Sequence, residues 1–424
     1  TSALYNIVDQ FFIGNSVGAL GNAATNIAFP LSTACISIAL LFGIGGASAF
    51  NLAKGRGNEE EAVHCMGNAI TGMMVLGCLL LLVTQLFLER MIRFFGAPDS
   101  IMEYAKTYIR ITSLGFPVLI LTAGGGHLIR ADGSPKMSMI CNVTGAIINT
   151  ILDALFVFGF EWGMAGAAWA TVTGQYISVM LVIRYLSHCK TVDLKPKHLK
   201  PAAGYMKKDV TLGAASCSNQ LAMMVVQLVM NKSLPYYGAL SSYGQEIPLA
   251  CAGIITKVNQ VFFSIIIGIS QGLQPIVSYN YGAKQYDRVK KGYLLAAKSG
   301  LMISVIAFLI FQIFPRQIIA IFGNGSEEYI RFAVSYFRIF LFFTFLNFIQ
   351  PITSNSFTAI GKPGLGMFLS LTRQILFLLP LIVILPFFIG IDGILFAGPI
   401  ADGLAGAVAV FLMYRELKRP EYQV

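Results

Sequence analysis

The sequence predicts an all-α integral membrane protein whose twelve transmembrane helices form two pseudo-symmetric six-helix bundles. Three observations carry this prediction. Hydrophobic residues make up 56% of the 424 residues and charged residues only 12%, the mean hydropathy is +0.70, and apolar stretches long enough to cross a bilayer recur along the whole chain. A water-soluble domain of this length would carry far more charge. We therefore expect lipid to surround most of the chain.

Windows of about 19 residues separate the apolar stretches into individual spans. The chain opens at Thr1 inside such a stretch, with neither an initiator Met nor a charged leader, so we expect residues of the first helix to be missing before it. The twelve expected spans are 1–16, 25–53, 63–88, 104–129, 136–160, 165–187, 209–236, 250–281, 292–315, 330–358, 364–389 and 392–414.

The net charge of +10 comes from Lys and Arg residues concentrated in alternate short loops. This pattern indicates topology rather than nucleic-acid binding, and it places those loops and both termini in the cytoplasm. The longest hydrophilic segment, 188–208, is rich in Lys and Pro and is the expected cytoplasmic linker between an amino-terminal lobe at 1–187 and a carboxy-terminal lobe at 209–424. Seven scattered cysteines show no metal-binding spacing.

An internal repeat relates the two lobes. Phe95-Gly96 is echoed by Phe322-Gly323, and Gly163 and Gly166 are echoed by Gly390 and Gly393. The clearest match is at a constant offset of 228 residues, where Ala131, Gly133, Pro135 and Met139 correspond to Ala359, Gly361, Pro363 and Met367. Because six helices, an even number, separate the copies, the two lobes have the same orientation in the membrane, and we expect substrate in the cleft between them.

Carboxylates at membrane depth are functional candidates by default, because their charge is costly there unless it faces a partner or a cavity. Asn149 and Asp153 are spaced i, i+4 and share one helix face. Asp153 lies nine residues before Trp162 and Thr171 nine residues after it, so both are about 13 Å from the outer turn. Asp9 falls in the same outer half of the bilayer.

The side chains of Asp9, Asn149, Asp153 and Thr171 are thus expected to converge. Two carboxylates close together in a low dielectric do not both stay charged and uncompensated, so such a cluster binds a proton or shares a cation. Hard oxygen ligands suit Na⁺ as well as H⁺, and the sequence leaves both open, with no other cofactor expected. The alternative is that these side chains are polar clamps satisfied by neighbours such as Tyr5 or Gln10.

Polar residues of other spans are candidates for lining the substrate cleft. Lys257 and Arg373 could pair with substrate or with lipid phosphate, although snorkelling toward a helix end explains them equally well. Asp402, close to Gly and Ala in the last span, is expected to have a structural role. The cleft candidates are Tyr5, Asn6, Asn219, Gln220, Lys257, Gln260 and Arg373.

At this point four segments resemble one family, the multidrug and toxic compound extrusion (MATE) transporters, of the prokaryotic kind that carries its acidic cluster in the amino-terminal lobe. The segments are Leu4-Tyr5-Asn6-Ile7-Val8-Asp9, Asn149-Thr150-Ile151-Leu152-Asp153, Gly166-Ala167-Ala168-Trp169-Ala170-Thr171, and the run 272–284, which reads GLQPIVSYNYGAK. The resemblance implies two bundles around a V-shaped cleft, with organic substrate exported against inward H⁺ or Na⁺. It also implies that Asp9, Asn149, Asp153 and Thr171 are the coupling residues.

Three other functions compete with this reading. A lipid-linked oligosaccharide flippase of the same superfamily shares the two-lobe plan, although few basic residues lie inside the spans. An intramembrane enzyme requires a paired catalytic constellation, which Asp9 and Asp153 could mimic as an aspartyl dyad. The two-half plan argues against it and no proteolytic motif surrounds either residue, so we expect no enzymatic activity. A channel requires a ring of equivalent ligands, which two non-identical halves do not supply.

The expected setting is the plasma membrane of a prokaryote, with membrane lipids and a small organic substrate as partners and a monomeric chain. Apolar, aromatic and amide side chains accept many shapes, so substrate identity is not readable from them. A cationic or amphipathic drug or metabolite is the default expectation.

Overall fold

The computed structural model describes residues 13, 19–95, 99–244, 246–321 and 327–422, which form helices, turns and loops but no strand. Within these residues, ten helical runs are long and apolar enough to cross a membrane, and a bent pair of helices makes an eleventh. They match the second to twelfth expected spans. The first expected span, 1–16, lies outside the described residues except for Ile13.

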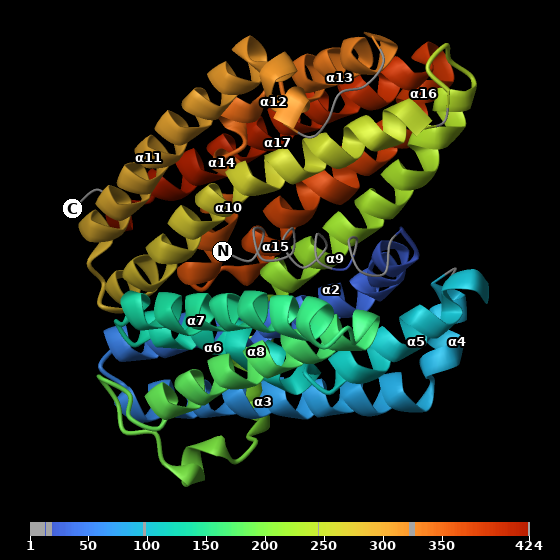
Figure 1. The fold of residues 1–424 in the computed structure, drawn as a ribbon. Helices are drawn as coiled ribbons and strands as arrows, with labels where there is room; N and C mark the ends of the chain where they lie inside the picture. The colour runs from blue at the N-terminus through green and yellow to red at the C-terminus, as the bar shows by residue number, and fades with distance from the viewer. Residues whose placement is uncertain (1–12, 14–18, 96–98, 245, 322–326, 423–424) are drawn as a thin grey trace. The chain divides into compact units, whose positions relative to one another are not determined.

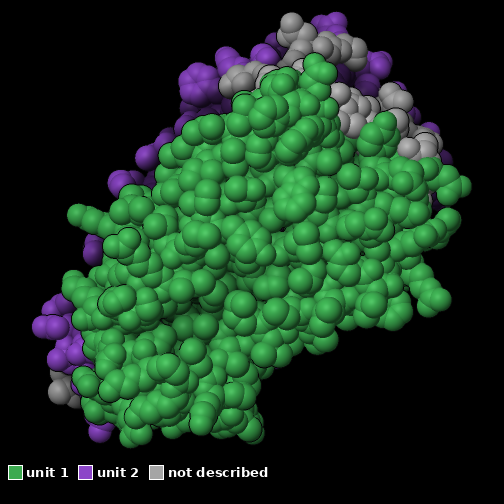
Figure 2. Space-filling view, turned by 60° about the horizontal axis from the view of Figure 1, so that its bottom comes forward, with its two compact units in different colours: residues 1–217 green, residues 218–424 purple. Residues whose placement is uncertain are grey.

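The chain divides into two compact units, Thr1–Cys217 and Ser218–Val424 (Figure 2). Each unit has its own apolar core, built in the first around Phe50, Met66 and Leu128 and in the second around Phe337 and Phe357. One helix, Ala203–Ala239, runs through the division, so its first turns belong to the first unit and the rest to the second. The last six residues of the expected linker 188–208 are therefore helical.

Long helices with short connections build the first unit (Figure 1). In chain order these elements are α2 (Ala19–Gly55), α3 (Glu59–Leu86), α4 (Leu88–Phe94), α5 (Asp99–Ser113), α6 (Phe116–Ala131), α7 (Pro135–Asp153), the π-helix η1 (Ala154–Gly159), α8 (Gly163–Leu186), the 3₁₀ turn η2 (Pro196–Leu199) and the start of α9 (Ala203–Ala239).

The second unit repeats this plan in the yellow to red part of the chain (Figure 1). After α9 come α10 (Glu246–Gly282), α11 (Tyr286–Ile313), α12 (Pro315–Ile321), α13 (Glu327–Phe340), η3 (Thr344–Leu346), α14 (Ile349–Ala359), α15 (Pro363–Leu371), the π-helix η4 (Thr372–Leu378), α16 (Leu379–Ile389), α17 (Ile391–Leu417) and η5 (Pro420–Tyr422).

The expected span 104–129 is not one straight helix. It is broken into α5 and α6, which are bent by 55° relative to each other. Pro117 explains where α6 begins, because its ring removes a backbone donor that a continuous helix would need, whereas the first turn of a new helix leaves that position unpaired anyway. The expected span 330–358 contains turns and the 3₁₀ segment η3 between α13 and α14, yet it remains one continuous span, Glu327–Ala359.

The repeat found in the sequence is also visible in the backbone. Gly133 has φ +83° and Gly361, 228 residues later, has φ +77°. Both end a helix in a conformation that only glycine adopts without strain, and a proline at the start of the next helix follows each of them. Gly163 and Gly390 likewise share a positive φ, and each hairpin that they close contains a π-helical segment, η1 or η4.

Candidate functional site

The structure places Asn149 and Asp153 on the buried face of α7. Asn149 is 3% exposed and Asp153 is fully buried. Asp153 is the last residue of α7, and the wider turns of η1 begin at the next residue. π-helical turns inside membrane helices often mark functional positions, since they re-aim the side chains at their edges.

Thr171 of α8 lies against this face. The Asn149 side chain donates a hydrogen bond from Nδ2 to Thr171 Oγ1, at 3.3 Å. The other amide atom, Asn149 Oδ1, is buried and accepts no hydrogen bond from any described residue. The α7–α8 interface therefore presents an oxygen ligand of the hard kind that suits Na⁺ or a protonated partner.

Small residues let α7 and α8 come this close. A Cβ on Gly174 would lie 2.9 Å from Asn149 Cβ, and a Cβ on Gly145 would lie 2.0 Å from Ser178 Oγ. Ser178 in turn donates its hydroxyl proton to the Cys141 carbonyl at 2.7 Å. Close approach of small residues with a hydroxyl bridge is a common way to hold two helices together in lipid.

The other amino-terminal candidates, Asp9, Tyr5 and Asn6, lie outside the described residues. The structure therefore brings together Asn149 and Thr171, with Asp153 one turn further along α7. Convergence of Asp9 on this group stays a prediction.

The cleft candidates of the second unit differ in their surroundings. Lys257 and Gln260 are one turn apart on α10 and are exposed, whereas Asn219 and Gln220 are partly buried on α9. Their role in binding substrate stays a prediction.

Arg373 has a partner that the sequence analysis did not anticipate. Its Nε lies 2.5 Å from Asp402 Oδ1, and the two side chains are 12% and 2% exposed. The guanidinium also lies over the Phe263 ring, 5.8 Å from its centroid, and the Asn347 side chain hydrogen-bonds Asp402. Charge at this depth in the second unit is thus compensated inside the protein, which fits the structural role expected for Asp402.

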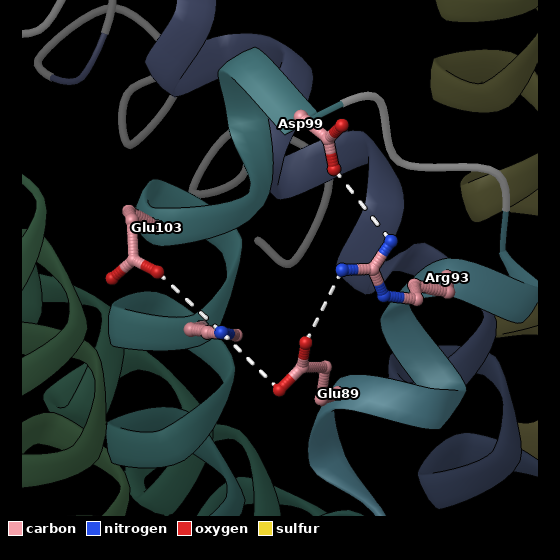
Figure 3. Close-up of polar contacts among 5 residues, drawn as sticks. Glu89, Arg93, Asp99 and Glu103 are labelled. Carbon is pink, nitrogen blue, oxygen red and sulfur yellow. Dashed lines mark hydrogen bonds and ion pairs between the residues drawn. The ribbon is translucent and has the colours of Figure 1, made fainter.

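An exposed ion network joins α4 to α5 (Figure 3). Arg93 bridges Glu89 at 3.3 Å and Asp99 at 3.6 Å, and Lys106 bridges Glu89 and Glu103, both at 3.4 Å. Hydrogen bonds from Arg93 and Lys106 lower the pKa of Glu89. These pairs are solvent-exposed, so they hold the ends of the two helices together weakly.

A second polar cluster lies where α6 ends. Asp132 is fully buried and accepts hydrogen bonds from the Tyr185 hydroxyl at 2.7 Å and the Lys190 backbone N–H at 2.6 Å. The backbone N–H and the hydroxyl of Thr191 also donate to it. This carboxylate fixes the start of the loop after α8, and burial there raises the pKa of the Cys189 thiol to about 12.

Comparison of the chain with models of known protein families identifies its family. The family model named MatE matches residues 1–155 and 215–384, well over half of the chain. The chain belongs to the MatE family. Members of this family are membrane transporters rather than enzymes, as the sequence predicted, and the family resemblance noted from the motifs is confirmed.

Curated relatives are similar over nearly the whole length of this MatE-family chain. The multidrug export protein MepA of Staphylococcus haemolyticus is 25% identical over 416 residues, which cover 97% of this chain and 89% of that protein. MepA of Staphylococcus aureus strain MSSA476 is 23% identical, with 97% and 90% covered.

Solved structures share the fold. A MOP superfamily transporter from Pyrococcus furiosus, described as having a binding pocket of reversed polarity, superposes with a TM-score of 0.90 at 21% identity, covering 98% of this chain and 92% of that one. A multidrug resistance MATE transporter in an outward-facing conformation gives the same score, identity and coverage. The all-helical transporter fold that the sequence predicted is therefore confirmed.

Sequence reasoning missed two groups of this MatE-family protein. The Arg373–Asp402 pair was missed because the two residues belong to different spans, although opposite charges at membrane depth are themselves a sign of pairing. The second is Asp209, a carboxylate at the edge of an expected span that the structure buries completely within the first unit.

Proposed function

We propose that this MatE-family protein is a secondary active antiporter that exports small organic molecules, lipophilic cations among them, in exchange for H⁺ or Na⁺. The names of its MepA relatives, which are multidrug export proteins, support the substrate class. The observation that carries the coupling is the fully buried carboxylate of Asp153, one turn beyond an amide–hydroxyl pair that spans two helices.

In this proposal Asn149, Asp153 and Thr171, together with Asp9, bind the coupling ion. A ligand shifts a conformational equilibrium only through its different affinity for the two states, so the ion site must change when the ion binds. Protonation or cation binding neutralises the buried charge and favours the α7–α8 packing described above. Loss of the ion leaves an uncompensated charge on Asp153, which disfavours this packing of α7 and α8. The resulting rearrangement of the helices alters the affinity for substrate.

The proposed sidedness follows the positive-inside rule, with both termini in the cytoplasm. The loops at Gly57, at Gly133 and between α10 and α11 then face the cytoplasm, and the hairpin at Glu161 faces outward. Substrate export on this orientation runs from the basic loops toward the α7–α8 hairpin.

The test is efflux of a fluorescent lipophilic cation from proteoliposomes, with a pH gradient and a Na⁺ gradient imposed separately. We expect one gradient to drive transport in the wild type and the Asp153→Asn variant to lose that dependence. The matched control is Glu161→Gln, which removes an exposed carboxylate from the same hairpin and should transport normally. Undiminished gradient-driven efflux by Asp153→Asn would refute the coupling role.

A further inference from the structure

Asp209 is a buried carboxylate that the proposed coupling site does not use. It is fully buried in α9, about two turns after the helix begins at Ala203. Neither Oδ1 nor Oδ2 is hydrogen-bonded or ion-paired with any described residue. An unpaired charge in such a place is far more costly than a neutral acid, so burial without a partner favours the protonated form.

The helix backbones around Asp209 are in direct contact. A Cβ on Gly45 of α2 would lie 1.9 Å from the Asp209 carbonyl oxygen, and a Cβ on Gly213 of α9 would lie 1.7 Å from the Leu41 carbonyl oxygen. Glycine on both helices is therefore what allows α2 and α9 to cross here. The Asp209 side chain is fully buried beside this crossing, so water reaches its carboxylate only when the packing around it loosens.

Other titratable groups lie at the same end of the helices, which the positive-inside rule assigns to the cytoplasm. Lys208 of α9 pairs with Glu61 of α3, and Cys65 of α3 is within electrostatic reach of Asp209. Lys54, the one charged residue in the α2 range, interacts with Asp132 and Glu59 instead. The ring of His64 on α3 packs against those of His198 and Tyr205.

We propose that Asp209 is a second proton-binding site, occupied while α9 is packed on α2, and that loss of its proton opens the Gly45–Gly213 crossing. α9 is the helix that continues from the first unit into the second. A proton bound near its start therefore affects the packing of a helix that both units share. The site lies apart from Asp153, and its existence does not depend on which ion drives transport.

Cys65 supplies a reporter at this place. Its thiol is fully buried on α3, so a maleimide reagent modifies it only when the surrounding helices separate. The experiment measures the rate of Cys65 modification by peptide mass spectrometry in purified full-length protein, from pH 6 to pH 9, for the wild type and for Asp209→Asn. The wild-type rate is divided by the Asp209→Asn rate at each pH. This ratio cancels the pH dependence of the thiol itself.

We expect this ratio to rise with pH, with a slope approaching about tenfold per pH unit once Asp209 ionises in the open form. A direct effect of the Asp209 charge on the thiol would lower the ratio, because a nearby negative charge disfavours the thiolate, so it does not imitate this result. Asp209→Leu, a second neutral side chain with the same branching at Cγ, should behave like Asp209→Asn and replaces it if the amide variant does not assemble. A ratio that stays constant or falls with pH overturns the proposal.

Discussion

Removing one partner of the Arg373–Asp402 pair should destabilise the second unit more than any exposed charge does. In the Asp402→Ala variant the Arg373 guanidinium, only 12% exposed, keeps its charge but loses the carboxylate 2.5 Å away. Leaving one charge of a buried pair uncompensated costs about 3–5 kcal/mol in proteins. The Phe263 ring offers partial compensation, which is worth about 1 kcal/mol, so we expect a loss of about 2–4 kcal/mol.

Reversible unfolding in mixed micelles, with rising SDS fraction, measures this loss. Asp392→Ala serves as the control, since Asp392 is an exposed carboxylate on the same helix, α17, and such substitutions usually change stability by no more than about 0.5 kcal/mol. The double variant Arg373→Met, Asp402→Ala should recover part of the loss, because it removes both charges. A double variant as unstable as the sum of the two single variants would refute the pairing.

Three further predictions follow from other parts of the structure. Gly174→Ala should cost about 1–3 kcal/mol of stability in the same unfolding assay, because its Cβ would meet Asn149 Cβ at 2.9 Å. Gly364→Ala is the control and should be neutral or stabilising, because nothing lies within 4 Å of its Cβ. Equal losses in the two variants would contradict the close packing of α7 and α8. Burial, and then the nearby His64, lower the pKa of His198, and its ring accepts the Lys195 backbone N–H at 3.0 Å. The stability that neutral His198 gives is therefore complete above its ordinary pKa of about 6.5 and is lost as the pH falls below it. The hydrogen-exchange protection of residues 190–200, relative to the intrinsic exchange rate at each pH, should fall between pH 7 and pH 5, and less so in His198→Gln; no difference between the two proteins would count against this cause. Glu89→Gln, in the exposed network of Figure 3, should change stability only slightly and lose that effect in high salt. A salt-independent loss would show that the network is more than a surface feature.

The sequence was sufficient for the fold because lipid imposes simple rules on it. Long apolar runs must be helices in a bilayer, so eleven of the twelve spans could be placed within six residues of their observed ends. The breaks inside spans were harder to predict. Hydropathy averages over about 19 residues, so it did not separate α5 from α6 at Gly115, nor did it show the π-helical turns of η1 and η4.

The candidate site, like the fold, was only partly predictable from the sequence. Equal distance from one hairpin predicted that Asp153 and Thr171 would lie at one depth, and helical spacing predicted that Asn149 would share the face of Asp153. The structure shows a hydrogen bond of 3.3 Å from Asn149, one turn before Asp153, to Thr171. Contacts between helices that are distant in sequence were not predictable in this way. Arg373 pairs with Asp402, and α9 packs against α2 at Asp209. Both contacts depend on helix packing that a single sequence does not specify.

The two repeats preserve backbone geometry and not charge, and this difference bears on coupling. The glycine turns recur at Gly133 and Gly361, and a π-helical segment recurs in η1 and η4. Position 153 of the first unit is an acid, however, while the position 228 residues later is Leu381. The second unit instead carries Arg373 and Asp402, which neutralise each other. A paired acid already has its counter-ion and has little need of a transported proton or Na⁺, so we expect ion coupling to reside in the first unit. An Asp402→Asn variant that is less stable but keeps the ion dependence of the wild type would agree with this assignment, and one that is stable but uncoupled would contradict it.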